Sequence, residues 1–221
     1  MKKKTEIPEA VHLKIMPGEG PLTGMSHWWG APDLPKGVPY PYICVKDRLP
    51  DGSEDVYEEP LTFLFQLRLD NIAHIRTGLP KEGMIYVFAP LDYYLGELDS
   101  PLDYHDEPVV LYSPSTDGLE PYEITWEGTD ESIFRPAEKI IVGEGEDIVL
   151  LGNPFHEEIA ESHGNQKCLL MLEENEEWGL RFLDCGTYYI FLEKDFCRRL
   201  EEATKLGETV RLEAFGDLFF Y

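Results

Sequence analysis

The chain has 221 residues, enough for one large domain or two small ones, and its 43% hydrophobic share is typical of a protein with a buried core. Forty-three acidic side chains against 19 basic ones give a formal net charge of −24. A field of that sign repels nucleic-acid phosphates and anionic lipid surfaces and favours cationic partners or plain solubility, so we expect neither nucleic-acid binding nor membrane association.

The termini and cysteines predict a cytoplasmic protein. Three lysines at residues 2–4 are followed by polar residues and a proline, where the apolar core of a secretion signal would have to stand. No stretch approaches the roughly 20 apolar residues that a membrane span requires. The four cysteines, Cys44, Cys168, Cys185 and Cys197, follow no disulfide framework, so we expect buried, reduced thiols.

The first half of the chain predicts strands separated by long loops. Residues 11–16 alternate apolar and polar side chains, as a half-buried strand does. Residues 28–42 carry four prolines, which exclude a helix, so we expect a loop that packs by its aromatic rings. Residues 47–59 are acidic and predicted to be a mobile excursion. Further strands are predicted at residues 61–69, 84–89, 109–112 and 122–126, and a short helix at 71–77, capped by Asp70.

The second half predicts two helices among further strands. Asn153 is expected to cap a helix that Gly164 ends, and Asp195 to cap an amphipathic helix that Gly207 ends. Strands are predicted at residues 168–172, 187–192 and 210–215, and the aromatic residues 218–221 are expected to dock in the core.

One order of features occurs twice along the chain. In each copy a Gly-x-Pro turn precedes an apolar strand, and a glycine then opens an aromatic strand; the copies are residues 30–32, 63–67 and 83–88, and residues 152–154, 168–172 and 186–191. We therefore predict an α+β fold, mainly antiparallel sheet built from two duplicated β-rich units, with few short helices and long loops. Residues 1–221 are expected to form a single domain, with pseudo-repeat halves at about 20–110 and 140–221.

Residues 26–35 resemble the opening signature of the YwqG-like family, also called domain of unknown function 1963. Residues 63–67, 79–88, 151–154 and 178–191 are similar to its later blocks. The resemblance covers roughly residues 20–195, with two departures: His27 and Trp29 stand where the family usually shows lysine and glycine. The family has no established activity, so the resemblance implies a fold and little else. It also suggests an association with toxin and immunity gene clusters.

The most site-like cluster combines His27, Trp28, Trp29 and Asp33. Aromatic faces attract sugars, bases and cations, and an imidazole titrates near neutral pH, so this cluster predicts a ligand platform. The structural alternative is that tryptophans in a proline-rich loop seal one edge of a sheet. Both interpretations stay open on the sequence alone.

Four further residues complete the ligand-binding candidates. Gln66 lies inside an apolar strand, where its amide needs partners, and a bond to a neighbouring loop is the simpler expectation than a substrate contact. Arg68 and Arg181 are rare cations in an acidic protein, expected to pair with carboxylates or, alternatively, to hold an anion. Trp178 is expected to form a further wall of a pocket between the two units.

Metal and catalytic motifs are absent from the sequence. His156, His163 and Cys168 are spaced too widely for the tight ligand pairs of a zinc site. Neither a Gly-x-Ser-x-Gly motif nor a phosphate-binding loop occurs. We expect no metal and no cofactor, and the sequence identifies no catalytic residue.

Two functions fit these observations. The first is an acidic, non-catalytic protein-interaction module, immunity-like, that binds a basic protein, because opposite fields speed association. The second is a small-ligand binder or uncharacterised enzyme with a pocket near the Trp28–Trp29 loop. We favour the first, since the net charge is the strongest signal in the sequence.

Overall fold

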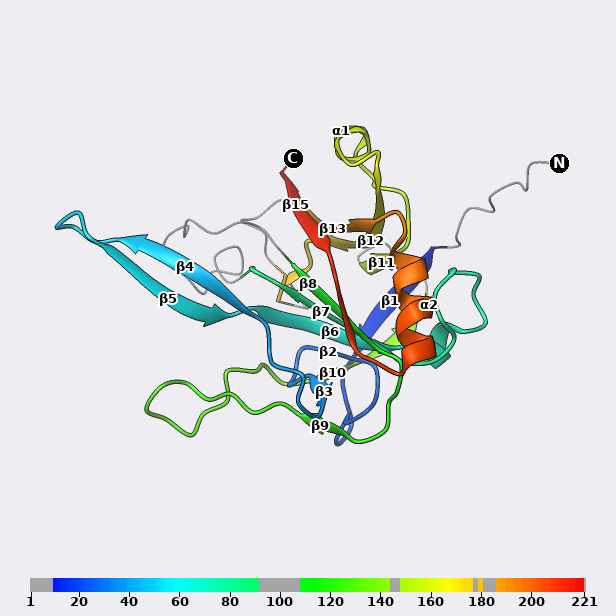
Figure 1. Cartoon of the computed structure of the whole chain (residues 1–221), viewed down its shortest axis with the longest axis horizontal. Coiled ribbons are helices and arrows are strands. Elements are labelled where there is room, and N and C mark those ends of the chain that lie inside the picture. Colours follow the sequence, from blue (N-terminus) through cyan, green and yellow to red (C-terminus); the bar gives the residue numbers. More distant parts are fainter. Residues whose placement is uncertain (1–9, 92–107, 144–147, 177–178, 181–185, 221) are drawn as a thin grey trace.

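The computed structural model describes residues 10–91, 108–143, 148–176, 179–180 and 186–220. Their main feature is a single antiparallel sheet (Figure 1). It contains eleven strands: β1 (Val11–Met16), β2 (His27–Trp28), β6 (Thr62–Arg68), β7 (Met84–Ala89), β8 (Val109–Ser113), β10 (Glu138–Val142), β11 (Ile148–Leu150), β12 (Gln166–Glu173), β13 (Gly186–Glu193), β14 (Val210–Leu212) and β15 (Ala214–Phe220).

The two ends of this sheet are joined by one residue. The strand order is β14-β8-β7-β6-β2-β10-β1-β11-β12-β13-β15, so β14 and β15 lie at opposite ends. In the chain, only Glu213 separates them. Because β14 pairs with β8 and β15 pairs with β13, the C-terminal segment bridges both ends and leaves the sheet nearly closed.

Among the described residues, two smaller sheets and three helices accompany the main sheet. The sheets pair β3 (Asp33–Pro35) with β9 (Leu119–Pro121), and β4 (Tyr42–Arg48) with β5 (Glu54–Pro60). The helices are η1 (Leu69–Ile72), α1 (Glu157–Ser162) and α2 (Phe196–Leu206). Figure 1 shows the β4–β5 ribbon extending away from the rest of the molecule. None of the helices in the described part of the chain is long and apolar enough to cross a membrane.

Helix α2 shows how the sequence builds the core. Phe196, Leu200 and Ala203 share one face of the helix and are buried in the largest apolar cluster, together with strand residues of the sheet. The helix ends at Gly207, whose φ of 70° is the left-handed conformation that glycine adopts without strain. Asp195 precedes the helix as predicted, but its carboxylate binds Arg198 and not a backbone amide.

The predicted α+β fold of two duplicated units is wrong. The protein is mostly β, and eleven of its strands form one continuous sheet that joins the two predicted halves. β14, from the second half, pairs with β8, from the first, and β1 lies between β10 and β11. The repeated sequence features are local, whereas strand order is set by long-range pairing that such features do not encode.

The repeated features nevertheless correspond to one turn geometry that occurs twice. Trp29 and Leu151 have positive φ angles, 51° and 59°, a conformation rare outside glycine. Trp29 donates its backbone N–H to the carbonyl of Leu64, and Leu151 donates its own to Leu169. Both acceptors lie at register shifts, in β6 and in β12. The sheet thus uses the same turn at two places, directly before Gly30 and Gly152.

Most other strand predictions are confirmed, and the exceptions are instructive. β1 and β7 have the predicted bounds. The predicted excursion at residues 47–59 is instead largely the β4–β5 hairpin, with seven paired positions. Residues 122–126 form no strand and contribute one isolated bridge, from Thr125 to Ser132. The helix predicted at residues 71–77 is instead the short η1, which begins at Leu69, so Asp70 lies inside it and does not cap it. The helix predicted after Asn153 is the short α1, which begins only after His156.

Candidate functional site

Asp33 is the centre of a buried polar network. Its side chain is almost completely inaccessible, at 1% exposure. The carboxylate accepts hydrogen bonds from the backbone N–H of Gly24 (2.7 Å) and the amide of Gln66 (2.5 Å), and its Oδ2 lies 3.6 Å from Nε2 of His27. The hydroxyl of Tyr86 donates to the Asp33 backbone oxygen, and burial, then the Asp33 charge, raises the Tyr86 pKa. Each of these contacts fixes the loop that carries Asp33 onto the sheet.

Gln66 connects two loop segments to β6. Its Oε1 accepts the backbone N–H of Asp33 (2.8 Å), and its Nε2 donates to the backbone oxygen of Met25 (2.9 Å) as well as to the Asp33 carboxylate. His27 pairs with Gln66 across β2 and β6, and its Nδ1 lies 2.6 Å from the backbone oxygen of Trp29. The polar atoms of this cluster therefore form hydrogen bonds with backbone groups and with one another, as buried polar groups require.

The two tryptophans have different environments. Trp28 is fully buried and stacks on Phe65, with ring centroids 5.9 Å apart. Trp29 packs against Trp28 at 4.9 Å, and the Arg135 guanidinium lies over its ring, 4.5 Å from the centroid. Arg135 also donates to the backbone oxygen of Gly179 (3.3 Å). The cation–π contact thus stabilises the Trp29 turn from its outer side.

Trp29 also lines a cavity of about 200 Å³. Its wall is mainly apolar and includes Tyr40, Phe63 and Phe134, and Trp126 and Glu59 stand at it as well. Trp28 does not line this cavity. A small apolar ligand is the chemistry that such walls favour.

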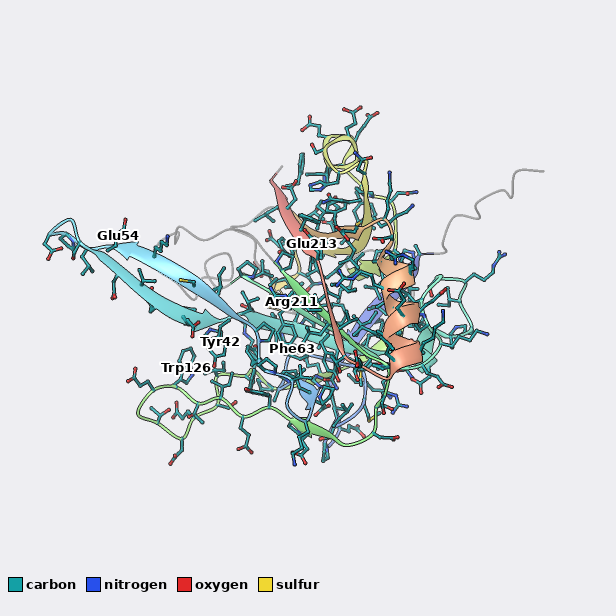
Figure 2. All side chains as sticks on the ribbon, in the orientation of Figure 1. Tyr42, Glu54, Phe63, Trp126, Arg211 and Glu213 are labelled. Carbon is teal, nitrogen blue, oxygen red and sulfur yellow. The ribbon has the colours of Figure 1, made fainter. Side chains whose placement is uncertain are left out.

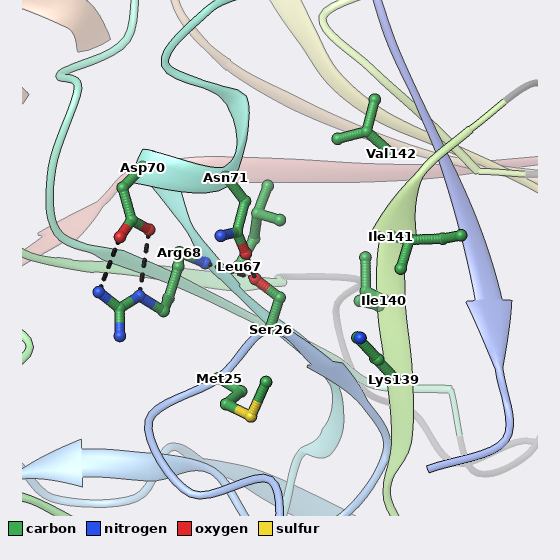
Figure 3. Close-up of a pocket in the computed structure, with 10 residues that line it drawn as sticks. All are labelled: Met25, Ser26, Leu67, Arg68, Asp70, Asn71, Lys139, Ile140, Ile141 and Val142. Carbon is green, nitrogen blue, oxygen red and sulfur yellow. Dashed lines mark hydrogen bonds and ion pairs between the residues drawn. The ribbon is translucent and has the colours of Figure 1, made fainter. Parts of the chain in front are cut away.

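A second, larger cavity of about 420 Å³ lies at the N-terminal end of β2 (Figure 3). Arg68 is held there by Asp70, through Nε (3.1 Å) and Nη2 (2.7 Å), and by the backbone oxygen of Gly24. The Ser26 hydroxyl accepts the backbone N–H of Arg68 and donates to Oδ1 of Asn71 (2.7 Å). Lys139 lines the opposite wall.

Two acidic segments project next to the 200 Å³ cavity. The β4–β5 arm, residues 42–60, carries six carboxylates and two basic side chains: Asp47, Asp51, Glu54, Asp55, Glu58 and Glu59, with Lys46 and Arg48. The Trp126 loop, residues 122–135, carries four exposed carboxylates, Glu123, Glu127, Asp130 and Glu131. Large apolar side chains lie exposed among them, notably Val56 (55%) and Trp126 (58%), and Figure 2 shows Tyr42, Glu54 and Trp126 on these projections.

The structure brings six of the eight candidate residues into one region. His27, Asp33 and Gln66 form the buried network, Trp28 and Trp29 pack beside it, and Arg68 lines the 420 Å³ cavity. Trp178 and Arg181 lie outside the described residues. Sequence reasoning missed Lys139, Asn71 and Trp126, because isolated lysine, asparagine and tryptophan residues carry no motif.

The described residues contain no group of three or more His, Cys, Asp or Glu side chains that could hold a metal ion. His163 instead binds Asp217 and stacks on Phe191. Cys168 is buried, which raises its pKa to about 12, but Cys44 is exposed, contrary to the prediction of buried thiols.

The chain matches a model of a protein family. A family model described as "Domain of unknown function (DUF1963)" matches residues 26–150, from the start of the buried network to the end of β11. That segment is more than half of the chain and includes the network, the Trp29 turn and both projections. No curated protein matches the chain.

Proposed function

The chain belongs to the DUF1963 family, whose description assigns no activity, and we propose that it is a non-catalytic protein-interaction module that binds a basic protein. The observation that carries this proposal is the β4–β5 arm, an acidic ribbon that projects from the molecule (Figure 1). Its partner would be recognised by positive charge and would contact the exposed apolar side chains of the arm and of the Trp126 loop.

The arm has the form of an interaction surface. Tyr42, Cys44 and Val56 lie on one face of the hairpin and are exposed, with Glu54 and Glu58 beside them. The arm forms no ladder with the main sheet. Two-stranded ribbons are marginally stable by themselves, and an exposed apolar strip on one is a surface that a partner stabilises.

The Trp126 loop supplies an aromatic side chain of the kind that dominates protein interfaces. Trp126 is exposed, and it lines the same cavity as Glu59 and Pro60 at the base of the arm. Tryptophan is enriched among residues that contribute most to binding energy. Carboxylates around such a residue steer a cationic partner and fix its orientation.

The net charge supports a salt-sensitive association. A formal charge of −24 speeds encounter with a cationic protein, and the effect weakens as added salt shortens the screening length below about 10 Å. The same field disfavours nucleic acid as the partner. We extend the proposal to a cytoplasmic location, to the YwqG-like subgroup, and to an immunity-like role in which the basic partner is a toxin.

Charge-matched variants test the arm. Glu54→Gln, Asp55→Asn and Glu58→Gln together remove three carboxylates from it, whereas Glu157→Gln, Glu158→Gln and Glu201→Gln remove three exposed carboxylates elsewhere. Tagged full-length protein is used to capture partners from lysate of the source organism at low and high salt, and bound proteins are identified by mass spectrometry. We expect one basic protein to be retained by the wild type and by the control variant at low salt, and to be lost from the arm variant.

Equal capture by the two triple variants would overturn the proposal, because it would show bulk charge attraction and no role for the arm. Circular dichroism of both variants controls for folding. A basic protein that stays bound at high salt on the arm variant would overturn it as well.

The alternative function is small-ligand binding beside the Trp29 turn. The 200 Å³ cavity, with Trp29, Phe63 and Phe134 in its wall, favours this alternative. A thermal-shift screen of small aromatic and aliphatic compounds tests it. Stabilisation that disappears on Phe134→Ala but persists in the arm variant would support the ligand function.

A further inference from the structure

The 420 Å³ cavity exists because β2 is only two residues long. His27 and Trp28 pair with β6 on one side and β10 on the other, and the last contact is the backbone hydrogen bond from Ile140 to Ser26 (3.3 Å). Beyond it, Leu67 and Arg68 on β6 face residues 140–142 on β10 with no strand between them (Figure 3). The space that one more pair of strand residues would fill is therefore open.

The charge in this cavity is opposite to that of the molecule. Among the described residues that line it, Asp70 is the only acidic one, and its carboxylate is already bound by the Arg68 guanidinium. Lys139 is exposed and has no ion pair or hydrogen-bond partner among the described residues. These described lining residues thus carry one uncompensated positive charge in a protein with a formal charge of −24.

The other polar groups are donors held in place. Three hydrogen bonds, two to Asp70 and one to Gly24, fix the Arg68 side chain. Asn71 accepts the Ser26 hydroxyl through Oδ1, which leaves its Nδ2 hydrogens for a ligand. Preorganised donors of this kind favour an anionic group over a neutral one.

The remaining wall is aliphatic. Leu67, Ile140, Ile141 and Val142 contribute branched side chains, and Met25, which is 42% exposed, stands at the edge. Apolar walls with a few convergent polar groups are the usual form of a small-molecule site. A phosphate-like dianion would leave these walls unused and would lie near the Asp70 carboxylate.

We propose that this cavity binds a small organic monocarboxylate. The carboxylate pairs with the Lys139 ammonium, with Asn71 and Arg68 as further donors, and the aliphatic body packs on Leu67, Ile140 and Ile141. This site is separate from the β4–β5 arm, so its test does not depend on the partner protein.

Titration of the full-length, ¹⁵N-labelled protein with hexanoate tests the proposal, with hexanamide as the neutral analogue and inorganic phosphate as the anion without an apolar body. We expect saturable amide shifts centred on Ser26, Arg68 and Ile141 with hexanoate. The matched variants are Lys139→Gln and Lys14→Gln. Lys14 is also exposed, and its side chain has no ion pair or hydrogen-bond partner among the described residues. It lies opposite Ile141 in the ladder of β1 and β10 but does not line the cavity.

Lys139→Gln is expected to weaken hexanoate binding by about tenfold or more, and Lys14→Gln by less than about twofold, since a lost charge-assisted hydrogen bond removes more affinity than a distant, screened charge. Three results would overturn the proposal: no saturable shift at these residues, equal binding of hexanamide or phosphate, or equal weakening by the two lysine variants.

Discussion

The side-chain amide of Gln66 donates a hydrogen bond to the carboxylate of Asp33, with 2.5 Å between Nε2 and Oδ2, and both side chains are buried. Gln66 also binds the backbone of Asp33 and of Met25. One amide on β6 therefore holds both Asp33, in the proline-rich segment that carries the Trp29 turn, and Met25, at the edge of the 420 Å³ cavity.

Gln66→Leu is expected to lower the free energy of unfolding by about 3 kcal/mol, because each buried polar group left without a partner costs about 1–3 kcal/mol. Urea unfolding measures the change. Glu201→Gln, at an exposed position of α2, should stay within about 0.5 kcal/mol of the wild type. A Gln66→Leu protein as stable as this control would show that the network contributes nothing to stability.

Gly83, directly before β7, is a position where the structure leaves no room for a side chain. Its φ is 103°, and a Cβ there would collide with the backbone oxygen of Ser113 and lie 2.7 Å from Cε2 of Tyr112. Gly118 also has a positive φ, 66°, but nothing lies within 4 Å of such a Cβ. Gly83→Ala is expected to cost about 3 kcal/mol and Gly118→Ala about 1 kcal/mol, since overpacking adds to the left-handed strain. Thermal unfolding of the two variants separates crowding from strain, and equal losses would contradict the crowding.

Local strands could be predicted well from the sequence. Residues 84–89 are all apolar or aromatic and form β7, buried along its whole length. Residues 11–16 alternate, and β1 alternates between buried and more exposed positions as expected. These signals succeed because the burial of a strand is written into consecutive side chains.

Sheet closure and the cavity could not be predicted in the same way. Nothing in the sequence around Glu213 indicates that the flanking strands pair at opposite ends of one sheet, because their partners lie far away in the chain. The β4–β5 arm lacks an apolar run, so its sequence predicts a mobile excursion and not a hairpin. The 420 Å³ cavity depends on where β2 begins, and Lys139 becomes notable only once its neighbours are known.

The Arg68–Asp70 ion pair is expected to stabilise the folded state at neutral pH and to lose this contribution in acid. A hydrogen bond from Arg68, and then the Arg68 charge, lower the pKa of Asp70 below its ordinary 3.8. A lowered pKa means that the pair stabilises the folded state above pH 3.8 and that this contribution is lost as the pH falls through the folded value. Because both side chains are partly exposed, we expect Asp70→Asn to cost only about 0.5 kcal/mol at neutral pH and nothing in stronger acid. Urea unfolding at neutral pH and in stronger acid measures this loss of stability, and the loss should vanish in an Arg68→Gln background.

The Glu193–Glu213 pair is expected to have the opposite effect on stability, because it destabilises the folded state as the pH rises. A hydrogen bond that the protonated Glu193 carboxyl donates to Glu213, and then the Glu213 charge, raise the pKa of Glu193 above 4.5, so the folded state binds this proton more tightly than the unfolded chain. The repulsion is therefore absent at low pH and appears as the pH rises through the raised value. Glu213→Gln should raise the melting temperature at neutral pH and leave it unchanged well below pH 4.5. Glu208→Gln removes an equal charge from an exposed position, and a matching rise with that variant would assign the effect to net charge alone.

The exposed Trp126 is expected to contribute to binding of the basic partner and little to the stability of the fold. Its side chain is 58% exposed, so Trp126→Ala should change the free energy of unfolding by less than about 0.5 kcal/mol. If the Trp126 loop contacts the basic partner, the same change should weaken binding by about tenfold or more, as expected for an aromatic side chain buried at an interface. Phe155→Ala, at a 47% exposed ring just before α1, is the control. Calorimetric titration with the captured partner compares the two. Since neither change alters the net charge, a loss confined to Trp126→Ala would separate a specific contact from electrostatic attraction, and equal affinities would place the interface elsewhere.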